Sequence, residues 1–283
     1  MAEKDCKERL DLVLTERGLY RSRSQAKRAI MAGEVRVDGE IIDKAGTKIS
    51  QDAEIEIKEK PPFVSRGGKK LKKALETFSI DVSNKLVLDV GSSTGGFTDC
   101  LLQSGARQVY AVDSGTNQLA WKLRKDDRVI VLEQTKFHEL IPGDLPDNFE
   151  VVTVDVSFIS LTLILPVAVN FMKPEADLIV LIKPQFEAGP ERVGKGGVVK
   201  DPEVQIMVIE KILKKLLELN ISSENLDYSP ITGASSGNRE FLLHGIYRPR
   251  KKFTRSEKQK ELEDWQQEIR NTVIAARDRL ERG

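Results

Sequence analysis

The feature that most constrains the fold is a series of short apolar segments, each about the length of one β-strand. They are rich in Val, Ile and Leu and are separated by stretches of helical composition. The segments are LVLDV (86–90), QVYAVD (108–113), VIVL (129–132), VVTVDV (151–156) and LIVLIK (178–183). Strands that alternate with helices are typical of a doubly wound α/β fold with a mostly parallel sheet. We therefore expect a ligand to bind beyond the carboxyl ends of these strands.

Two further apolar segments follow close together near the end of this region. LDYSPI (226–231) and REFLLHGIY (239–247) flank a turn rich in Gly and Ser. This arrangement predicts an antiparallel hairpin that closes the sheet. A mostly parallel sheet with an antiparallel C-terminal hairpin resembles the Rossmann-like methyltransferase fold rather than that of a dehydrogenase.

The first sixty residues predict a separate, smaller domain, because 283 residues exceed the size at which one core usually stops growing. RLDLVLTERGL and SRSQAKRAIMAG favour two helices, EVRVDGEII a hairpin through Asp38-Gly39, and AEIEIK a further strand. Basic residues gather around the second helix and the strand after it: Arg17, Arg21, Arg23, Lys27, Arg28 and Arg36. The cluster is compatible with an ordinary solvated face and with a surface for nucleic acid.

The order of helix, basic helix, glycine and strand over Arg9 to Ile57 resembles the αL module, a small α+β domain named for ribosomal protein S-four. The resemblance implies binding of structured RNA through shape and phosphate contacts. The stretch after it, KEKPPFVSRGG, combines Pro and Gly and reads as a linker. The predicted domains are an αL RNA-binding domain over 1–59, a linker over 60–68, a methyltransferase domain over 69–250 and a helical C-terminal extension over 251–283.

Composition favours a globular protein. The chain carries 45 Lys and Arg against 44 Asp and Glu, and 40% of its residues are hydrophobic, so it is not disordered. Two cysteines make no disulfide framework and the start holds no apolar secretory segment, so we expect a cytoplasmic protein. The apolar run over 151–172 is nearly long enough to cross a bilayer. It contains Asp155, and a carboxylate inside a bilayer costs free energy. We therefore expect this run to form a buried strand, a loop and a helix, and we expect no membrane partner.

The segment LVLDVGSSTGGFTD (86–99) places a carboxylate and a Gly-rich loop at a strand end. A Walker loop would need Lys and then Ser or Thr after its last glycine, and a dinucleotide loop would need Gly-x-Gly-x-x-Gly. Asp89 would repel phosphates, whereas S-adenosylmethionine carries a sulfonium and an ammonium group and no phosphate. The sequence therefore predicts an S-adenosylmethionine site, with a turn that only closes a βα unit as the alternative.

Acidic residues after the next two strands extend this predicted site. Asp113 ends its strand where an acid would bind ribose hydroxyls, and Glu133 follows VIVL, where it would border the adenine. The predicted cofactor-binding residues are Asp89, Gly91, Ser93, Thr94, Gly95, Gly96, Phe97, Thr98, Asp113 and Glu133.

Four more charged residues stand around the same edge of the sheet. Asp155 and Lys183 close two strands, Glu240 begins the last strand, and Lys69 lies on the helix that enters the domain. Each alone has an ordinary explanation as a cap or a surface charge. Together they resemble, in order and element, the Lys-Asp-Lys-Glu tetrad of the FtsJ-like ribose 2′-O-methyltransferases, which implies that all four are catalytic.

A narrower resemblance covers Arg9 to Tyr247. The αL module, VSRGGKKL, LDVGSSTGGFTDCLL, VDSGTNQLAWKLR, DVSFISL, LIKPQFEAG and GNREF together resemble the TlyA family. The resemblance implies S-adenosylmethionine-dependent 2′-O-methylation of cytidine in ribosomal RNA, with ribosomal subunits as partners. Where exocyclic amine methyltransferases carry Asn/Asp-Pro-Pro-Tyr, this chain reads DVSF (155–158), so methylation of a base amine is unsupported.

Lys183 would orient or deprotonate the ribose hydroxyl, or stabilise the alkoxide, and the sequence leaves these roles open. Arg66, and Arg192 and Lys195 in a Gly-rich loop, complete the predicted RNA-binding residues. His138 and His244 are isolated in the sequence, which predicts no metal site. The rival functions are a membrane-damaging haemolysin, a name that the TlyA family also carries, and an RNA-binding protein with an inactive methyltransferase fold.

Overall fold

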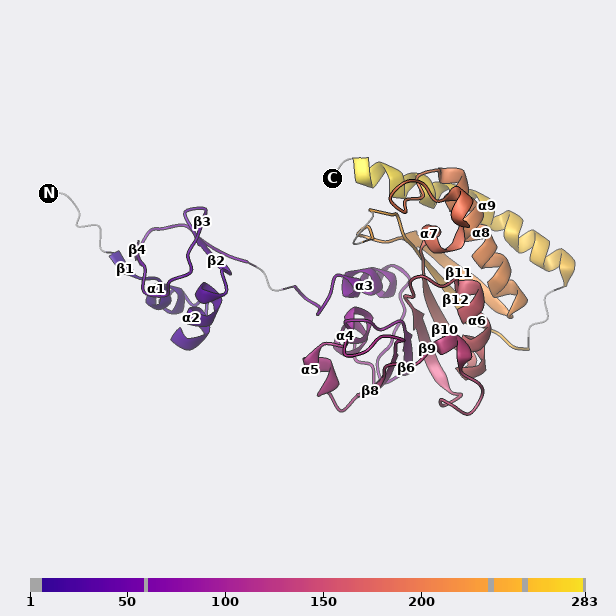
Figure 1. Ribbon diagram of the computed structural model, residues 1–283, viewed down its shortest axis with the longest axis horizontal. Helices are drawn as coiled ribbons and strands as arrows, with labels where there is room; N and C mark the ends of the chain where they lie inside the picture. The colour runs from indigo at the N-terminus through magenta and orange to yellow at the C-terminus, as the bar shows by residue number, and fades with distance from the viewer. Residues whose placement is uncertain (1–6, 59–60, 234–236, 251–253, 282–283) are drawn as a thin grey trace. The chain divides into compact units, whose positions relative to one another are not determined.

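The computed structural model describes residues 7–58, 61–233, 237–250 and 254–281. The chain divides into two compact units, Met1–Pro61 and Pro62–Gly283. Figure 1 shows the ribbon of both units. Each unit has a hydrophobic core of its own.

The N-terminal unit packs two short helices against short strands. Its elements are β1 (Lys7–Arg9), α1 (Leu10–Glu16), α2 (Arg23–Met31), β2 (Val35–Val37), β3 (Glu40–Ile41), β4 (Lys48–Ser50) and β5 (Ile55–Ile57). Ser22 caps α2 because its side chain accepts a hydrogen bond from the backbone N–H of Gln25. The predicted hairpin is present: β2 pairs antiparallel with β3, and its turn residues Asp38 and Gly39 have φ of 50° and 82°, which suits a two-residue turn.

The second unit is built on a seven-stranded sheet. Its strands are β6 (Leu86–Val90), β7 (Gln108–Val112), β8 (Val129–Leu132), β9 (Phe149–Val154), β10 (Met172–Ile182), β11 (Ile221–Tyr228) and β12 (Phe241–Tyr247). Their order across the sheet is β11-β12-β10-β9-β6-β7-β8, and β12 runs antiparallel to both of its neighbours. The predicted α/β fold with an antiparallel C-terminal hairpin is confirmed.

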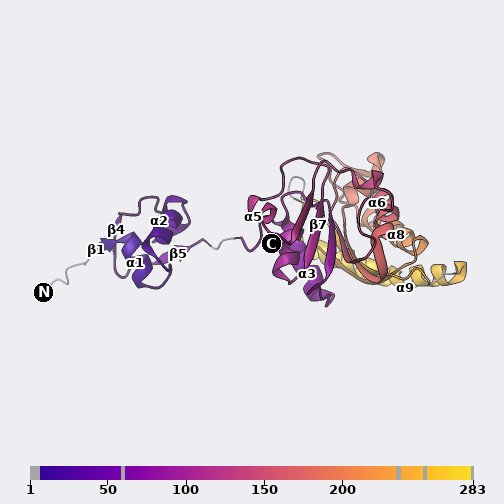
Figure 2. The same ribbon diagram turned by 90° about the horizontal axis from the view of Figure 1, so that it is seen from below.

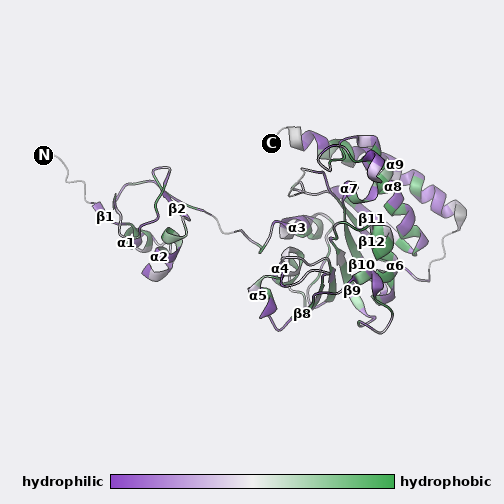
Figure 3. Ribbon diagram, in the orientation of Figure 1, coloured by the Kyte–Doolittle hydropathy of each residue, from purple (hydrophilic) through white to green (hydrophobic). Residues whose placement is uncertain are grey.

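Helices cover both faces of this sheet (Figures 1 and 2). One face carries α3 (Gly67–Thr77), α4 (Gly96–Gln103) and α5 (Trp121–Arg124), and the other carries α6 (Leu161–Ala168), α8 (Pro202–Glu218) and α9 (Arg255–Glu281). The short elements η1 (Phe137–Glu139), η2 (Val169–Phe171), α7 (Pro184–Glu187) and η3 (Pro190–Arg192) lie in the connections. Figure 3 shows the consequence: the central strands are hydrophobic, because both faces of the sheet are buried.

The C-terminal helix α9 is part of the second unit. Its apolar stripe, Trp265, Ile269, Val273 and Ala276, is at most 8% exposed and belongs to the core that α8 and β11 share. The rest of α9 is hydrophilic (Figure 3). Because these four apolar residues are spaced three or four apart, they lie on one face of the helix, and that face packs against the domain.

The long apolar run divides between several elements, as the sequence predicts. It forms β9, a loop, α6 and η2, and Val151, Val152 and Leu165 are fully buried. In the described part of the chain, no helix combines the length and the hydrophobicity that crossing a bilayer requires.

Candidate active site

A cavity of about 470 Å³ lies at the carboxyl edge of the sheet. Its walls come from the loop between β6 and α4, the residues that follow β9 and β10, the first turn of α3, and residues 231–232. Open α/β sheets bind ligands at this edge, and roughly 300–1,000 Å³ is the usual range for ligand pockets. The cavity is therefore the candidate active site.

Lys183 and Asp155 form an ion pair in this cavity. Asp155 follows β9 and Lys183 follows β10, and these two strands are parallel neighbours, so both side chains emerge at the same edge. Lys183 Nζ lies 2.6 Å from Asp155 Oδ1 and donates a hydrogen bond of 2.9 Å to Ser157 Oγ. Lys183 is only 9% exposed. Burial of a charged side chain costs free energy unless the charge is paired, and the Asp155 carboxylate supplies that partner.

The second lysine of the cluster is Lys70, and the prediction of Lys69 at this place is wrong. Lys70 lines the cavity, and its Nζ lies 2.5 Å from Glu240 Oε2, with both residues buried. Adjacent residues of an α-helix point about 100° apart, so Lys69 is exposed and lines a different groove. The sequence GGKK offers two lysines; the buried side chain of Leu71 fixes which one faces the cavity.

The glycine loop follows β6 directly, and two of its glycines are needed for close packing of the chain. A Cβ on Gly91 would lie 2.6 Å from the backbone oxygen of Asp155, and one on Gly96 would lie 2.8 Å from the backbone N of Gly68. Gly91 thus lets the ends of β6 and β9 approach, and Gly96 lets α3 pack on α4. Of the predicted cofactor-binding residues, those that line the cavity are Gly91, Ser93, Thr94, Gly96 and Phe97.

Asp89 does not line the cavity, contrary to the prediction. It lies inside β6 and is fully buried; Thr98 donates a hydrogen bond of 2.6 Å to its Oδ2, and Thr153 one of 2.9 Å to its Oδ1. Burial raises the pKa of Asp89 to about 6, which the two hydroxyl hydrogen bonds partly offset. Asp89 and Thr98 therefore tie α4 to the sheet, and Asp155 is the carboxylate that faces the cavity.

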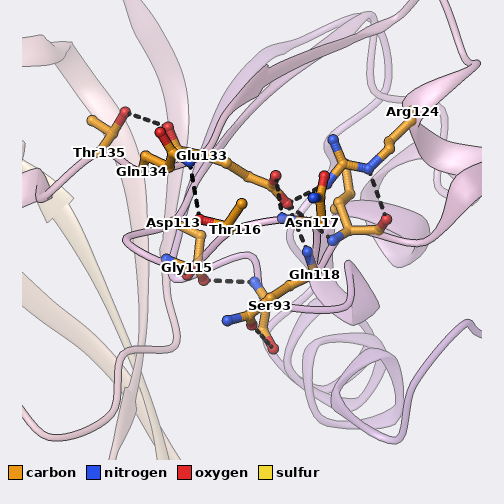
Figure 4. Close-up of polar contacts among 11 residues, drawn as sticks. Ser93, Asp113, Gly115, Thr116, Asn117, Gln118, Arg124, Glu133, Gln134 and Thr135 are labelled. Atoms are coloured by element: carbon orange, nitrogen blue, oxygen red, sulfur yellow. Dashed lines mark hydrogen bonds and ion pairs between the residues drawn. The ribbon is translucent and has the colours of Figure 1, made fainter.

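The two other predicted cofactor acids hold loops in place (Figure 4). Asp113 accepts hydrogen bonds from the backbone N–H groups of Ser93, at 2.8 Å, and Gly115, at 2.7 Å. Glu133 accepts from the backbone N–H groups of residues 117–119 and pairs with Arg124. The Arg124 guanidinium and these N–H groups lower the pKa of Glu133 to about 2. Neither acid lines the cavity of about 470 Å³.

Several predicted RNA-binding residues of the N-terminal unit have partners inside that unit. Buried Asp11 lies 3.1 Å from Arg23 and 3.9 Å from Lys27. Arg17 donates to the backbone oxygens of Gln51 and Ala53, and Arg36 donates to that of Gly39. Arg21 and Arg28 are exposed. The basic cluster thus combines residues that hold the fold with residues that face solvent.

In the second unit, Arg66 lines the cavity, whereas Arg192 and Lys195 lie in the loop after α7. Asn238 anchors that loop: its Oδ1 accepts a hydrogen bond from the N–H of Val199, and its Nδ2 donates to the oxygen of Gly197. Because Asn238 stands two residues before Glu240, the anchored loop and the Lys70–Glu240 pair share one segment.

Sequence reasoning missed two features beside Lys183. Ser157 accepts a hydrogen bond from it, and the next residue, Phe158, is 91% exposed with φ of 63°. The Phe158 ring packs on Phe186 at a centroid distance of 5.0 Å. The signal was present in DVSF, where an aromatic residue follows the strand-end acid at the spacing found in amine methyltransferases.

Two known families match the chain. The FtsJ-like methyltransferase family matches residues 63–247, and the S4 domain matches residues 8–55. The first match covers well over half of the chain and contains every element that surrounds the cavity.

Individual relatives match most of the chain. YqxC of Bacillus subtilis (strain 168), named as a candidate rRNA methyltransferase, is 52% identical over 240 residues, which cover 84% of this chain and 85% of the relative. TlyA of Mycobacterium tuberculosis (strain ATCC 25618 / H37Rv), named a 16S/23S rRNA (cytidine-2′-O)-methyltransferase, is 44% identical over 237 residues, with 83% and 88% covered. The solved structure of a candidate hemolysin from Streptococcus thermophilus matches with a TM-score of 0.72 and 41% identity, covering 99% of this chain and 98% of that one.

Proposed function

We propose that this chain, which belongs to the TlyA family of FtsJ-like methyltransferases with an N-terminal S4 domain, methylates the 2′-hydroxyl of a cytidine in ribosomal RNA. The methyl donor is S-adenosylmethionine. The substrate is rRNA within a ribosomal subunit, and the reaction takes place in the cytosol.

The observation that carries this proposal is the pair of buried lysine–carboxylate contacts at one edge of the cavity. Lys70 belongs to α3, whereas Asp155, Lys183 and Glu240 directly flank β9, β10 and β12, and each ion pair is nearly buried. Two lysines beside a pocket suit a reaction in which an anionic RNA backbone binds and negative charge develops on an oxygen.

Lys183 acts as a hydrogen-bond donor in this mechanism. The Asp155 carboxylate lies 2.6 Å from Lys183 Nζ and holds it in place, so Lys183 orients the ribose 2′-oxygen and stabilises the charge that grows on it. Asp155 is the one carboxylate among the described residues that line the cavity, which makes it the acceptor for the hydroxyl proton. Glu240 holds Lys70 in the position from which it contacts the RNA backbone.

The residues around the glycine loop fit S-adenosylmethionine. The loop supplies space where Gly91 lines the cavity, Ser93 and Thr94 supply hydroxyls, and Phe97 supplies an apolar wall. Asp155 complements the positive charge of the cofactor. When bound, the cofactor supplies an electrophilic methyl group on its sulfonium.

Phe158 suits the base of the target nucleotide. An exposed ring one residue from Ser157 offers a stacking face beside the lysine that orients the ribose. RNA-modifying proteins commonly stack a splayed-out base on an aromatic side chain. The Phe158–Phe186 pair would hold the cytosine while the 2′-hydroxyl enters the cavity.

The test is transfer of labelled methyl from S-adenosylmethionine to unmodified ribosomal subunits and to free rRNA, followed by mapping of the modified ribose. We expect label on a 2′-oxygen of cytidine, and a kcat lower by roughly 10²–10³ in Lys183→Ala. Lys214→Ala is the matched control, because Lys214 is an exposed lysine of α8 on the opposite face of the sheet.

Three outcomes would contradict the proposal. Label on a base nitrogen or carbon would replace ribose chemistry with base chemistry. Absence of cofactor binding would favour an RNA-binding protein with an inactive fold. Lysis of erythrocytes or lipid vesicles by a protein that transfers no methyl group would favour the haemolysin.

A further inference from the structure

A second groove of about 420 Å³ runs along the outer side of α3. Its lining combines the apolar residues Pro62, Phe63 and Pro230 with the lysines Lys69, Lys72 and Lys73, and the polar residues Glu76, Gln103 and Ser104 complete it. Grooves that bind single-stranded nucleic acid likewise combine cationic side chains, which contact phosphates, with apolar surface that the bases and sugars contact.

Two of the three lysines are available to a ligand. Lys69 is exposed and makes no ion pair among the described residues. Lys72 pairs with Glu76, four residues along the helix, and both are more than half exposed, so that ion pair is weak. Lys73 is committed to the fold, because its Nζ lies 2.7 Å from Asp227 Oδ2 and 3.9 Å from the centre of the Tyr228 ring.

The groove adjoins the active-site cavity. Arg66 lines the cavity and Lys69, one helical turn later, lines the groove; residues three apart on a helix share a face. On the other wall, Pro230 lines the groove, and the next two residues, Ile231 and Thr232, line the cavity. The first turn of α3 and the 230–232 segment therefore border both spaces.

We propose that this groove holds the RNA strand immediately next to the methylated nucleotide, with Lys69 and Lys72 contacting its phosphates. The inference rests on the proposed function for the identity of the strand. It assigns Lys69, which does not line the active-site cavity, a role in substrate binding. Arg66, Lys69 and Lys72 would then follow one strand along about 9 Å of helix, at 1.5 Å of rise per residue.

The experiment measures binding of the full-length protein to transcribed, unmodified rRNA over a series of salt concentrations. The variants are Lys69→Gln, Lys72→Gln and the double variant, with Lys214→Gln as the matched control. The slope of log affinity against log salt is negative. Its magnitude should decrease by about 0.7 for each phosphate of a single strand that a variant no longer neutralises. In methylation assays the variants should raise the KM for RNA and leave kcat at saturating RNA unchanged.

The outcomes separate this inference from the proposed function. If Lys69→Gln and Lys72→Gln leave the salt slope equal to that of Lys214→Gln, the groove binds no RNA, whether or not the protein methylates rRNA. If the magnitudes of their slopes decrease while no methyl is transferred, the groove binds RNA and the proposed function fails. A lower kcat with an unchanged KM would show that Lys69 acts in the chemical step instead.

Discussion

The charged residues on the two sides of the glycine loop differ in what they bind. At one end of the sheet, the reactive end, which carries β9, β10 and β12, lysines and carboxylates pair with each other beside a cavity. Lys183 pairs with Asp155, and Lys70 pairs with Glu240. At the other end of the sheet, the structural end, which carries β7 and β8, Asp113 and Glu133 accept hydrogen bonds from backbone N–H groups of neighbouring loops.

The difference teaches how to separate chemical roles from structural ones. A carboxylate that accepts two or three backbone N–H groups fixes the loop that donates them, so its removal disturbs that loop. An ion pair that faces a cavity can exchange a partner for a substrate atom without breaking the main chain. Substitutions at the two ends should therefore change different measurements.

The largest effect should follow from removing Lys70. We expect Lys70→Ala to lower kcat by roughly 10²–10³, because the cavity loses a positive charge beside the RNA backbone. The substitution also leaves Glu240 buried without its partner, which destabilises a fold by about 3–5 kcal/mol. Single-turnover kinetics and urea unfolding measure the two effects separately.

The double variant Lys70→Ala/Glu240→Ala controls for unfolding, since it removes the unpaired carboxylate. It should regain most of the stability and none of the activity. Lys69→Ala should keep kcat and weaken only RNA binding. The cavity assignment is overturned if Lys69→Ala loses kcat while Lys70→Ala keeps it.

The next effect concerns Asp89, which belongs to neither end because it is fully buried beneath the loop. Its folded pKa of about 6 lies above the ordinary value of 3.8, so the native state binds this proton more tightly than the unfolded state. The resulting stabilisation is present below pH 3.8 and is lost as the pH rises through 6. At pH 7 the buried charge costs about 3 kcal/mol, from 1.36 kcal/mol per pKa unit.

Asp89→Asn should therefore be at least as stable as the parent at pH 7 and should flatten the pH dependence of the unfolding free energy between pH 4 and 6. Urea unfolding at several pH values checks this. Affinity for S-adenosylmethionine should change only a few-fold, because Asp89 does not line the cavity. A tenfold or greater loss of cofactor affinity would restore the direct interaction that the sequence suggested.

The strands of the sheet and the closing hairpin could be predicted because each strand carries its own signal. Apolar runs such as LIVLIK are continuous where both faces of the sheet are buried, and Asp38-Gly39 specifies a tight turn by its backbone preferences. The position of α9 could not be predicted, since a thin apolar stripe fits a core, a dimer or a free helix equally well.

The site could be predicted to the level of elements and not always to the residue. Strand ends place Asp155 and Lys183 at one edge by topology alone. Lys70 was missed because the rotation of α3 depends on packing of Leu71 and Ala74, which no local pattern of lysines encodes. Asp89 was misplaced because a strand-end carboxylate can turn inward when hydroxyls such as those of Thr98 and Thr153 receive it.

A smaller effect should follow from substitution of Phe158, whose ring is exposed to solvent at the reactive end. Phe158→Ala should raise the KM for RNA by roughly tenfold, since stacking of a base on an aromatic ring contributes about 1–3 kcal/mol, and Phe158→Leu should recover only part of it. Leu163→Ala is the control, as Leu163 is an exposed apolar residue of α6. Equal effects in Phe158→Ala and Leu163→Ala would argue against a stacked base.

The smallest effect should come from Glu133 at the structural end. Glu133→Gln keeps one acceptor oxygen and loses the charge that pairs with Arg124, so we expect a stability loss of about 1 kcal/mol. Because the pKa of Glu133 is lowered from 4.5 to about 2, its stabilisation is present above pH 4.5 and is lost as the pH falls towards 2. Hydrogen exchange should show faster exchange at the amides of Asn117, Gln118 and Leu119, which donate to this carboxylate, with kcat unchanged. If kcat falls as far as in Lys70→Ala while those amides stay protected, Glu133 takes part in the reaction, and the division between the two ends of the site is wrong.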